Sequence, residues 1–142
     1  SPGRLQLVRT EPPLLLDGAH NPAGALTLAN TLGTEFSDKP LIALIAVLAE
    51  KDAEGLLANL SGMFERAVIT QSTSPRSMPI ADLEPIASGL LGADVVGFTD
   101  FRAGLVRAQE LAVELDGMVV VTGSITLVGD VIKLIQEESD AQ

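Results

Sequence analysis

The chain has 142 residues, with nine Lys and Arg against nineteen Asp and Glu. Its formal net charge of −10 argues against nucleic-acid binding, because phosphate backbones are bound by basic surfaces, while 46% hydrophobic residues indicate a globular core and the length fits one domain over 1–142. The absence of Cys and the single His exclude disulfide scaffolds, Cys-ligated zinc, iron–sulfur clusters, thiol nucleophiles and metal sites made of several histidines.

Short apolar runs alternate along the chain with longer segments of helical spacing. An apolar run between turn residues predicts a strand, and apolar residues three to four positions apart predict an amphipathic helix. In chain order, we expect strands at 5–8 and 14–16, a helix at 22–33, a strand at 41–48, a helix at 51–60, a strand at 67–70, a helix at 80–91, a strand at 94–98, a helix at 101–115, a strand at 118–121 and a helix at 127–137.

This alternation indicates βαβ crossovers and therefore a Rossmann-like, three-layer α/β domain, with a mainly parallel sheet of about six strands and helices on both faces. The first two strands are joined too tightly for a crossover, so we expect a hairpin at one edge. Ligands of such sheets bind beyond the carboxyl ends of the strands. The polar segments predicted there are Asp17-Gly18-Ala19-His20, Glu50-Lys51-Asp52, Gln71-Ser72, Thr99-Asp100 and Thr122-Gly123-Ser124.

The segment 16–22 is the strongest candidate for a binding site. Asp17 ends a predicted strand, and its carboxylate can accept hydrogen bonds from two vicinal hydroxyls, such as those of a ribose. His20 comes just before a predicted helix N-terminus, where free N–H groups and the helix dipole favour anions. The alternative interpretation is a loop followed by a helix start, and for Asn21 a capping role before Pro22 is the favoured one.

Other polar residues at strand ends have two interpretations each. Ser124 can present its hydroxyl and backbone N–H to an anion or cap the next helix, and no base lies beside it to make it a nucleophile. Lys51 can meet a phosphate and Asp52 can cap a helix, but a solvated loop is the favoured interpretation of both. Taken alone, Arg76 in its loop and Arg4 near the chain start are expected to be exposed surface residues.

Several motifs are absent from the sequence. It contains neither the GxxxxGK[ST] loop that cradles a triphosphate nor GxGxxG after a strand, and no clustered carboxylates suggest a metal site. The longest apolar run, 41–49, is too short to span a bilayer, and no signal-peptide pattern is present, so we expect a cytoplasmic protein. The chain opens without an initiator Met, which suggests part of a longer protein that holds the rest of the active site.

Five segments carry a resemblance to a known family: Pro2-Gly3-Arg4-Leu5, Leu15-Leu16-Asp17-Gly18-Ala19-His20-Asn21-Pro22, Leu48-Ala49-Glu50-Lys51-Asp52, Ser74-Pro75-Arg76 and Val121-Thr122-Gly123-Ser124. Their order and spacing resemble the C-terminal domain of folylpolyglutamate synthase, including its bifunctional dihydrofolate synthase form, in the Mur ligase superfamily. The resemblance implies an ATP-dependent amide ligase that adds L-glutamate to folate or dihydropteroate through an acyl phosphate. It also implies that the P-loop and the Mg²⁺ ligands lie in an N-terminal domain absent from this chain.

The resemblance also implies roles for individual residues. Arg4 resembles an arginine that contacts the nucleotide phosphates and helps couple the two domains, and Asp17 resembles the aspartate that holds the ribose hydroxyls. His20 resembles the catalytic histidine that reaches the active site and helps place glutamate, and Ser124 resembles the serine that binds the glutamate carboxylate. Further candidates within the matching segments are Asn21, Lys51, Asp52 and Arg76.

Two positions depart from the family pattern. Glu50 stands where Asp is frequent, and Ile125-Thr126 follows the Thr-Gly-Ser turn where an aromatic residue is common. Two alternatives stay open, namely another Mur-type amino-acid ligase and a non-catalytic α/β nucleotide-binding module. The Asp-Gly-Ala-His-Asn-Pro string argues against the first and the missing initiator Met against the second. As a ligase domain, the isolated chain is expected to be inactive.

Overall fold

The structure is a computed structural model that describes residues 5–141. Arg4, a predicted nucleotide contact, lies outside the described residues. The alternation of strands and helices predicted from the sequence is confirmed. In chain order the elements are β1 (Gln6–Val8), β2 (Leu14–Leu16), α1 (Pro22–Glu35), β3 (Leu41–Ile45), α2 (Ala53–Asn59), β4 (Arg66–Ile69), α3 (Ile80–Leu90), β5 (Asp94–Gly97), α4 (Phe101–Leu115), β6 (Met118–Thr122) and α5 (Ile125–Asp140).

The six strands form one sheet in the order β1-β2-β6-β3-β4-β5. The strand β1 pairs antiparallel with β2, as expected for the hairpin, and every other pair is parallel. The strand β6 therefore lies between β2 and β3, although it comes last in the sequence. Its position brings the carboxyl ends of β2, β6 and β3 side by side.

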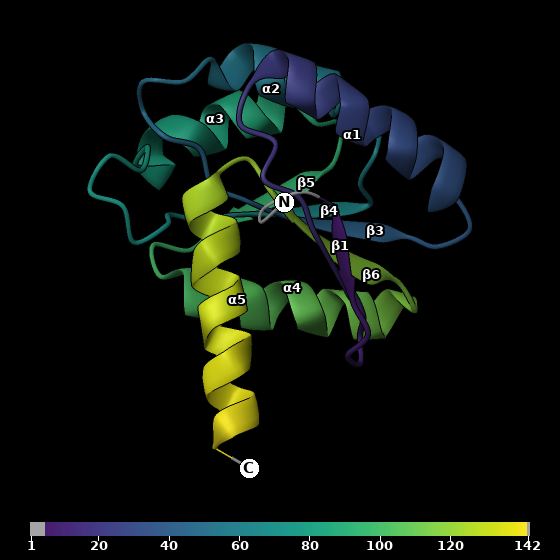
Figure 1. Cartoon of the computed structure of the whole chain (residues 1–142). Coiled ribbons are helices and arrows are strands. Elements are labelled where there is room, and N and C mark those ends of the chain that lie inside the picture. Colours follow the sequence, from purple (N-terminus) through teal and green to yellow (C-terminus); the bar gives the residue numbers. More distant parts are fainter. Residues whose placement is uncertain (1–4, 142) are drawn as a thin grey trace.

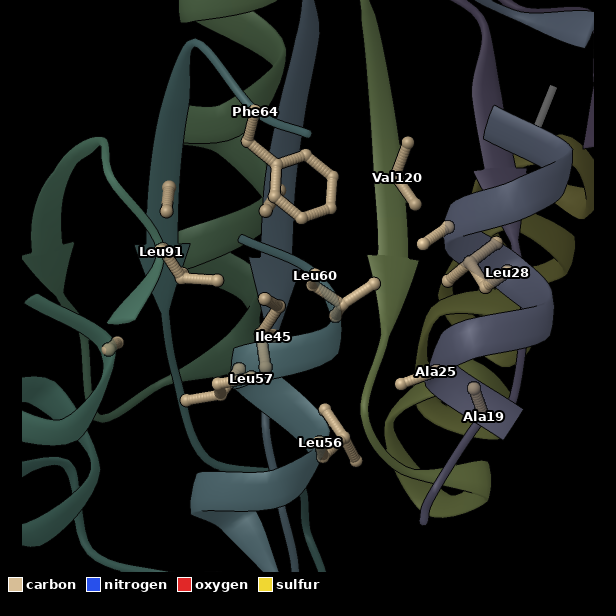
Figure 2. Packing of buried hydrophobic residues seen from close by; sticks show 14 of the residues in the cluster. Ala19, Ala25, Leu28, Ile45, Leu56, Leu57, Leu60, Phe64, Leu91 and Val120 are labelled. Carbon is tan, nitrogen blue, oxygen red and sulfur yellow. The ribbon is translucent and has the colours of Figure 1, made fainter. Parts of the chain in front are cut away.

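Helices cover both faces of the sheet (Figure 1). Helices α1, α2 and α3 pack on one face, and α4 and α5 pack on the other. Each face of the sheet has its own hydrophobic core, and successive residues of β6 point into opposite cores. Met118 and Val120 belong to the first core, under α1, α2 and α3, and Val119 and Val121 belong to the second, under α4 and α5. Figure 2 shows the first core, to which β6 contributes Val120, α1 contributes Ala25 and Leu28, and α2 contributes Leu56 and Leu57. Continuous apolar strands are typical of a sheet buried on both faces.

Several element boundaries differ from the sequence prediction, and α1, β3 and α5 show why. Helix α1 passes through Gly33 and ends two residues later, because Gly33 lies on the exposed side and needs no positive φ. The predicted strand 41–48 pairs only as far as Ile45, and its continuation stays buried and forms a single bridge, from Leu48 to Ser77. Helix α5 is longer than predicted at both ends, since Ser124 caps it directly and exposed polar residues continue it to Asp140.

Candidate functional site

A hollow of about 280 Å³ lies at the carboxyl edge of the sheet. Four segments meet there: the one after β2, the one after β3, the loop between β4 and α3, and the start of α5. The strand order explains the meeting, because the four segments extend from neighbouring strands β2, β6, β3 and β4. The described residues that line the hollow are His20, Leu48, Glu50, Lys51, Arg76, Ser124, Ile125 and Thr126.

Backbone hydrogen bonds between the chain that follows β2 and the end of β6 hold the segment that carries His20. The Asp17 N–H donates to the Val121 carbonyl at 3.0 Å, and the Gly123 N–H donates to the Ala19 carbonyl at 3.0 Å. The His20 Nδ1 lies 3.0 Å from the Gly18 carbonyl oxygen. A carbonyl can only accept, so Nδ1 carries the proton in that bond and Nε2 remains available to a ligand. Neutral His20 thus offers an acceptor at Nε2.

Ser124 reaches the hollow from a tight turn that requires glycine. Gly123 has a φ of +100°, and a Cβ there would collide with the carbonyl oxygen of Ala46. Ser124 is 1% exposed, and its Oγ accepts from the N–H groups of Thr126 at 3.1 Å and Leu127 at 3.3 Å. The predicted cap is therefore confirmed, and the hydroxyl hydrogen remains free to donate to an anion.

Asn21 and Asp52 act as helix caps and do not line the hollow. The Asn21 Oδ1 accepts from the Gly24 N–H at 2.8 Å, which confirms the capping role favoured for it. The Asp52 Oδ1 accepts from the Gly55 N–H at 2.9 Å, so Asp52 is a helix cap and the favoured interpretation as a solvated loop residue was wrong. In each residue, one side-chain oxygen is thus held by a backbone N–H group.

The remaining wall of the hollow consists of two loops that pair with each other. The Ala49 N–H donates to the Arg76 carbonyl at 2.8 Å, and the Met78 N–H donates to the Val47 carbonyl at 2.7 Å. An Arg76 guanidinium nitrogen lies 2.6 Å from the Glu50 Oε2, with side chains 66% and 45% exposed. The expected exposure of Arg76 is confirmed, and the pair holds its charge beside Lys51 at the hollow.

Asp17 does not reach the hollow. Its Oδ1 accepts from the Ala19 N–H at 2.8 Å, which closes a short turn after β2. Burial raises the pKa of Asp17 above the ordinary 3.8, and the Ala19 hydrogen bond offsets part of that rise. One carboxylate oxygen is thus held by the backbone, and the predicted ribose contact stays a prediction.

Some lining residues were not predicted as site residues from the sequence. Ile125 is 56% exposed although it is large and apolar, and it directly follows the capping Ser124. The sequence signal that could have indicated Ile125 is its place as an apolar residue in the first turn of a helix at the carboxyl edge of the sheet. Glu50 was placed in a polar segment at a strand end but was not predicted as a site residue, because its contact with Arg76 joins residues 26 positions apart.

The described residues form neither a metal-ligand cluster nor a membrane-spanning helix. Between residues 5 and 141, no three His, Asp or Glu side chains gather in a way that could hold a metal ion. No helix in that range combines the length and the apolar composition needed to cross a bilayer.

Residues 3–125 match the model of the family described as "Mur ligase, glutamate ligase domain". The dihydrofolate synthase/folylpolyglutamate synthase of Mycobacterium tuberculosis is 43% identical over 96 residues, which cover 68% of this chain and 20% of that protein. The protein of the same name from Bacillus subtilis is 28% identical over 139 residues, covering 93% of this chain and 30% of that protein. The chain thus spans less than a third of the length of these two curated relatives.

Solved structures agree with this assignment. The folylpolyglutamate synthase of M. tuberculosis, complexed with ADP and AMPPCP, matches with a TM-score of 0.88 and 35% identity over 94% of this chain and 32% of that one. The folylpolyglutamate synthase of Thermotoga maritima matches with a TM-score of 0.83 and 31% identity, covering 96% of this chain and 31% of that one. The predicted fold and the predicted resemblance are both confirmed. The chain belongs to the Mur ligase, glutamate ligase domain family.

Proposed function

We propose that this chain is the C-terminal domain of an ATP-dependent ligase that adds L-glutamate to the carboxylate of a folate or of dihydropteroate. Ligases of both kinds appear in the names of its relatives. The observation that carries the proposal is the hollow where His20, Lys51, Arg76 and Ser124 meet. It combines two cations and hydrogen-bonding groups at the edge of the sheet where α/β proteins bind ligands. Such a ligase would work in the cytoplasm.

In this proposal the hollow receives the carboxylates of L-glutamate. The helix α5 begins there, and the positive end of its dipole together with the Ser124 hydroxyl favours an anion. Lys51 makes no salt bridge with any residue of the described chain, so its charge is available to the second carboxylate. Arg76 adds a further positive charge, which Glu50 partly neutralises.

His20 would place the amine of L-glutamate for attack. The reaction joins the amine nitrogen to the carbonyl carbon of an acyl phosphate, releases phosphate and removes one proton from the nitrogen. The open Nε2 can accept a hydrogen bond from that nitrogen, because Nδ1 is engaged by the Gly18 carbonyl. Holding the amine close to the acyl group is the main catalytic contribution that this domain can make.

The nucleotide would lie near the segment that follows β2. We assign the ribose hydroxyls to Asp17, whose second oxygen is free of the Ala19 contact, and the phosphates to Arg4. The M. tuberculosis relative complexed with ADP supports nucleotide use in this family. Mg²⁺ would neutralise phosphate charge, but the described residues offer no set of ligands that fits it, so we assign it to an N-terminal domain.

The test is phosphate release by the full-length ligase with Mg-ATP and L-glutamate, with dihydropteroate or tetrahydrofolate in separate reactions. Release should require both L-glutamate and a pterin substrate, and His20→Ala should lower it by at least about tenfold. The 142-residue chain alone should release none. A folded, nucleotide-binding protein without pterin-dependent release would overturn the proposed substrate class.

A matched control separates the hollow from general charge effects. Lys51→Ala should raise the KM for L-glutamate, because it removes a charge at the hollow. Lys39→Ala removes the same charge from an exposed position just before β3, at the opposite edge of the sheet. Equal KM values in the two variants would place L-glutamate elsewhere.

A further inference from the structure

Among the described residues, one acidic side chain of helix α5, that of Asp130, holds the loop 71–79, which carries Arg76. The Asp130 Oδ2 accepts from the Thr73 N–H at 2.8 Å, and its Oδ1 accepts from the Thr73 hydroxyl at 2.7 Å. Thr73 is exposed and lies 57 positions from Asp130 in the sequence. Both carboxylate oxygens are therefore committed to one residue of the loop.

Internal hydrogen bonds tie the residues of the loop 71–79 to one another. The Ser72 N–H donates to the Ser77 Oγ at 3.0 Å, and the Arg76 N–H donates to the Ser74 Oγ at 3.1 Å. The Ser77 N–H also donates to the Ser74 carbonyl at 3.0 Å. A displacement of Thr73 is thus transmitted to Arg76, three residues away.

Helix α5 forms the opposite wall of the hollow with its first turn. Ser124 caps this helix, and Asp130 follows six residues later, roughly 9 Å along the axis at 1.5 Å per residue. The helix is anchored independently of Asp130, because Leu127, Val128 and Val131 are buried in the core. Helix α5 therefore positions Ser124 at its start and, through Asp130, binds the loop that carries Arg76.

We propose that Asp130 is a positioning residue that sets the spacing between Arg76 and Ser124 across the hollow, and thereby the fit of L-glutamate. This inference rests on the proposed function. Without Asp130 the loop remains paired with the segment after β3, through the Arg76 carbonyl and Glu50, but loses its connection to α5. The expected defect is in the binding of one substrate and not in folding.

The experiment measures steady-state kinetics of the full-length ligase with Asp130→Ala, Asp130→Asn and Thr73→Val. Asp130→Ala should raise the KM for L-glutamate roughly three- to tenfold, with kcat and the KM for ATP within about twofold. Asp130→Asn keeps one acceptor oxygen and should restore part of the affinity. Adding Thr73→Val to Asp130→Ala should cause no further rise, since Thr73→Val removes one of the two hydrogen bonds that Asp130→Ala already removes.

If Asp130 acted only through its charge, Asp130→Ala would change the KM for L-glutamate in the opposite direction. Removing a carboxylate near an anion site should lower the KM for L-glutamate, whereas losing the loop attachment should raise it. Glu137→Ala is the matched control, because it removes an exposed carboxylate from the same helix and makes no hydrogen bond to the loop among the described contacts. A KM that falls in both Asp130→Ala and Glu137→Ala would overturn the inference.

Amide hydrogen exchange supplies a readout that does not depend on turnover. Asp130→Ala should increase exchange at Thr73 and within 71–79, while the buried turn of α5 stays protected. If the wild-type enzyme is active and Asp130→Ala leaves the KM for L-glutamate unchanged, the inference is overturned but the proposed function is not. A wild type without glutamate-dependent release overturns the proposed function and, with it, this inference.

Discussion

The two walls of the hollow are held by different kinds of interaction. His20 and Ser124 form the first wall, where backbone hydrogen bonds between the segments after β2 and β6 fix the chain. Glu50, Lys51 and Arg76 form the second wall, where exposed side chains extend from two paired loops. The first wall is an extension of the sheet, whereas the second depends on contacts between loops.

This difference indicates that the two walls have different roles. Buried groups with fixed hydrogen bonds keep one geometry, because leaving any of them unpaired is costly. Exposed ion pairs contribute little to stability and can rearrange when a ligand competes for the same charge. The first wall is therefore suited to orient a reacting group, and the second to attract and accommodate charge. Substitutions in each wall should have different consequences.

The largest effect is expected from Gly123→Ala. The substitution places a Cβ against the Ala46 carbonyl at a φ of +100°, so the turn before Ser124 has to move. We expect a loss of about 3 kcal/mol or more in the free energy of unfolding, measured with urea. Gly129→Ala is the control, since a Cβ within α5 meets nothing within 4 Å and should stabilise by about 0.5–1 kcal/mol. Similar results for the two variants would refute the fixed geometry of the first wall.

Ser124→Ala should have a smaller effect on the same wall. It removes the oxygen that accepts from the N–H groups of Thr126 and Leu127, so the first turn of α5 loses its cap. The expected loss is about 1 kcal/mol in the free energy of unfolding. Ser124→Thr retains a capping hydroxyl and should restore most of it. An unchanged stability in Ser124→Ala would show that the cap contributes nothing.

Asp17→Asn tests the segment that leads to His20 through its pH dependence. Because the folded state raises the pKa of Asp17, the stabilisation from its neutral form is complete below the unfolded pKa and is lost as pH rises through the folded pKa. Asn stays neutral and can still accept from the Ala19 N–H. The variant should therefore gain stability relative to wild type as pH rises above 3.8, which urea unfolding at acid and neutral pH would detect. A difference independent of pH would contradict the assigned burial.

The smallest effect is expected in the second wall. Glu50→Gln breaks an ion pair between side chains that are largely exposed, so the free energy of unfolding should change by less than about 0.5 kcal/mol. A double-mutant cycle with Arg76→Gln measures the coupling directly. Coupling above about 1 kcal/mol would mean that this wall is as rigid as the first.

The first wall was largely predictable from the sequence, whereas for the second wall the sequence named Lys51 and Arg76 as candidates but not the contacts that hold the wall together. Local patterns locate the strands, the cap at Ser124 and the turn at Gly123, because each depends on residues close in sequence. The Glu50–Arg76 pair and the Asp130–Thr73 contact join residues 26 and 57 positions apart, and no local pattern predicts them.

The same distinction explains the boundary errors. The apolar run 41–48 looks like one strand, but pairing stops at Ile45, because the neighbouring strand β6 turns away at Gly123. Helix α1 passes Gly33, which was predicted to end it, because an exposed helical glycine costs little where packing holds the helix on both sides. Tertiary contacts decided both outcomes.

The charge of the chain has a kinetic consequence for the hollow. The sequence carries a net charge of −10, whereas the start of α5 and the cations Lys51 and Arg76 face the hollow. An anion therefore meets repulsion at long range and attraction at contact. Added salt screens interactions beyond about 10 Å more than those within a partly buried site. The association rate of an anionic ligand with this chain should consequently rise with ionic strength before it falls, the reverse of electrostatic steering.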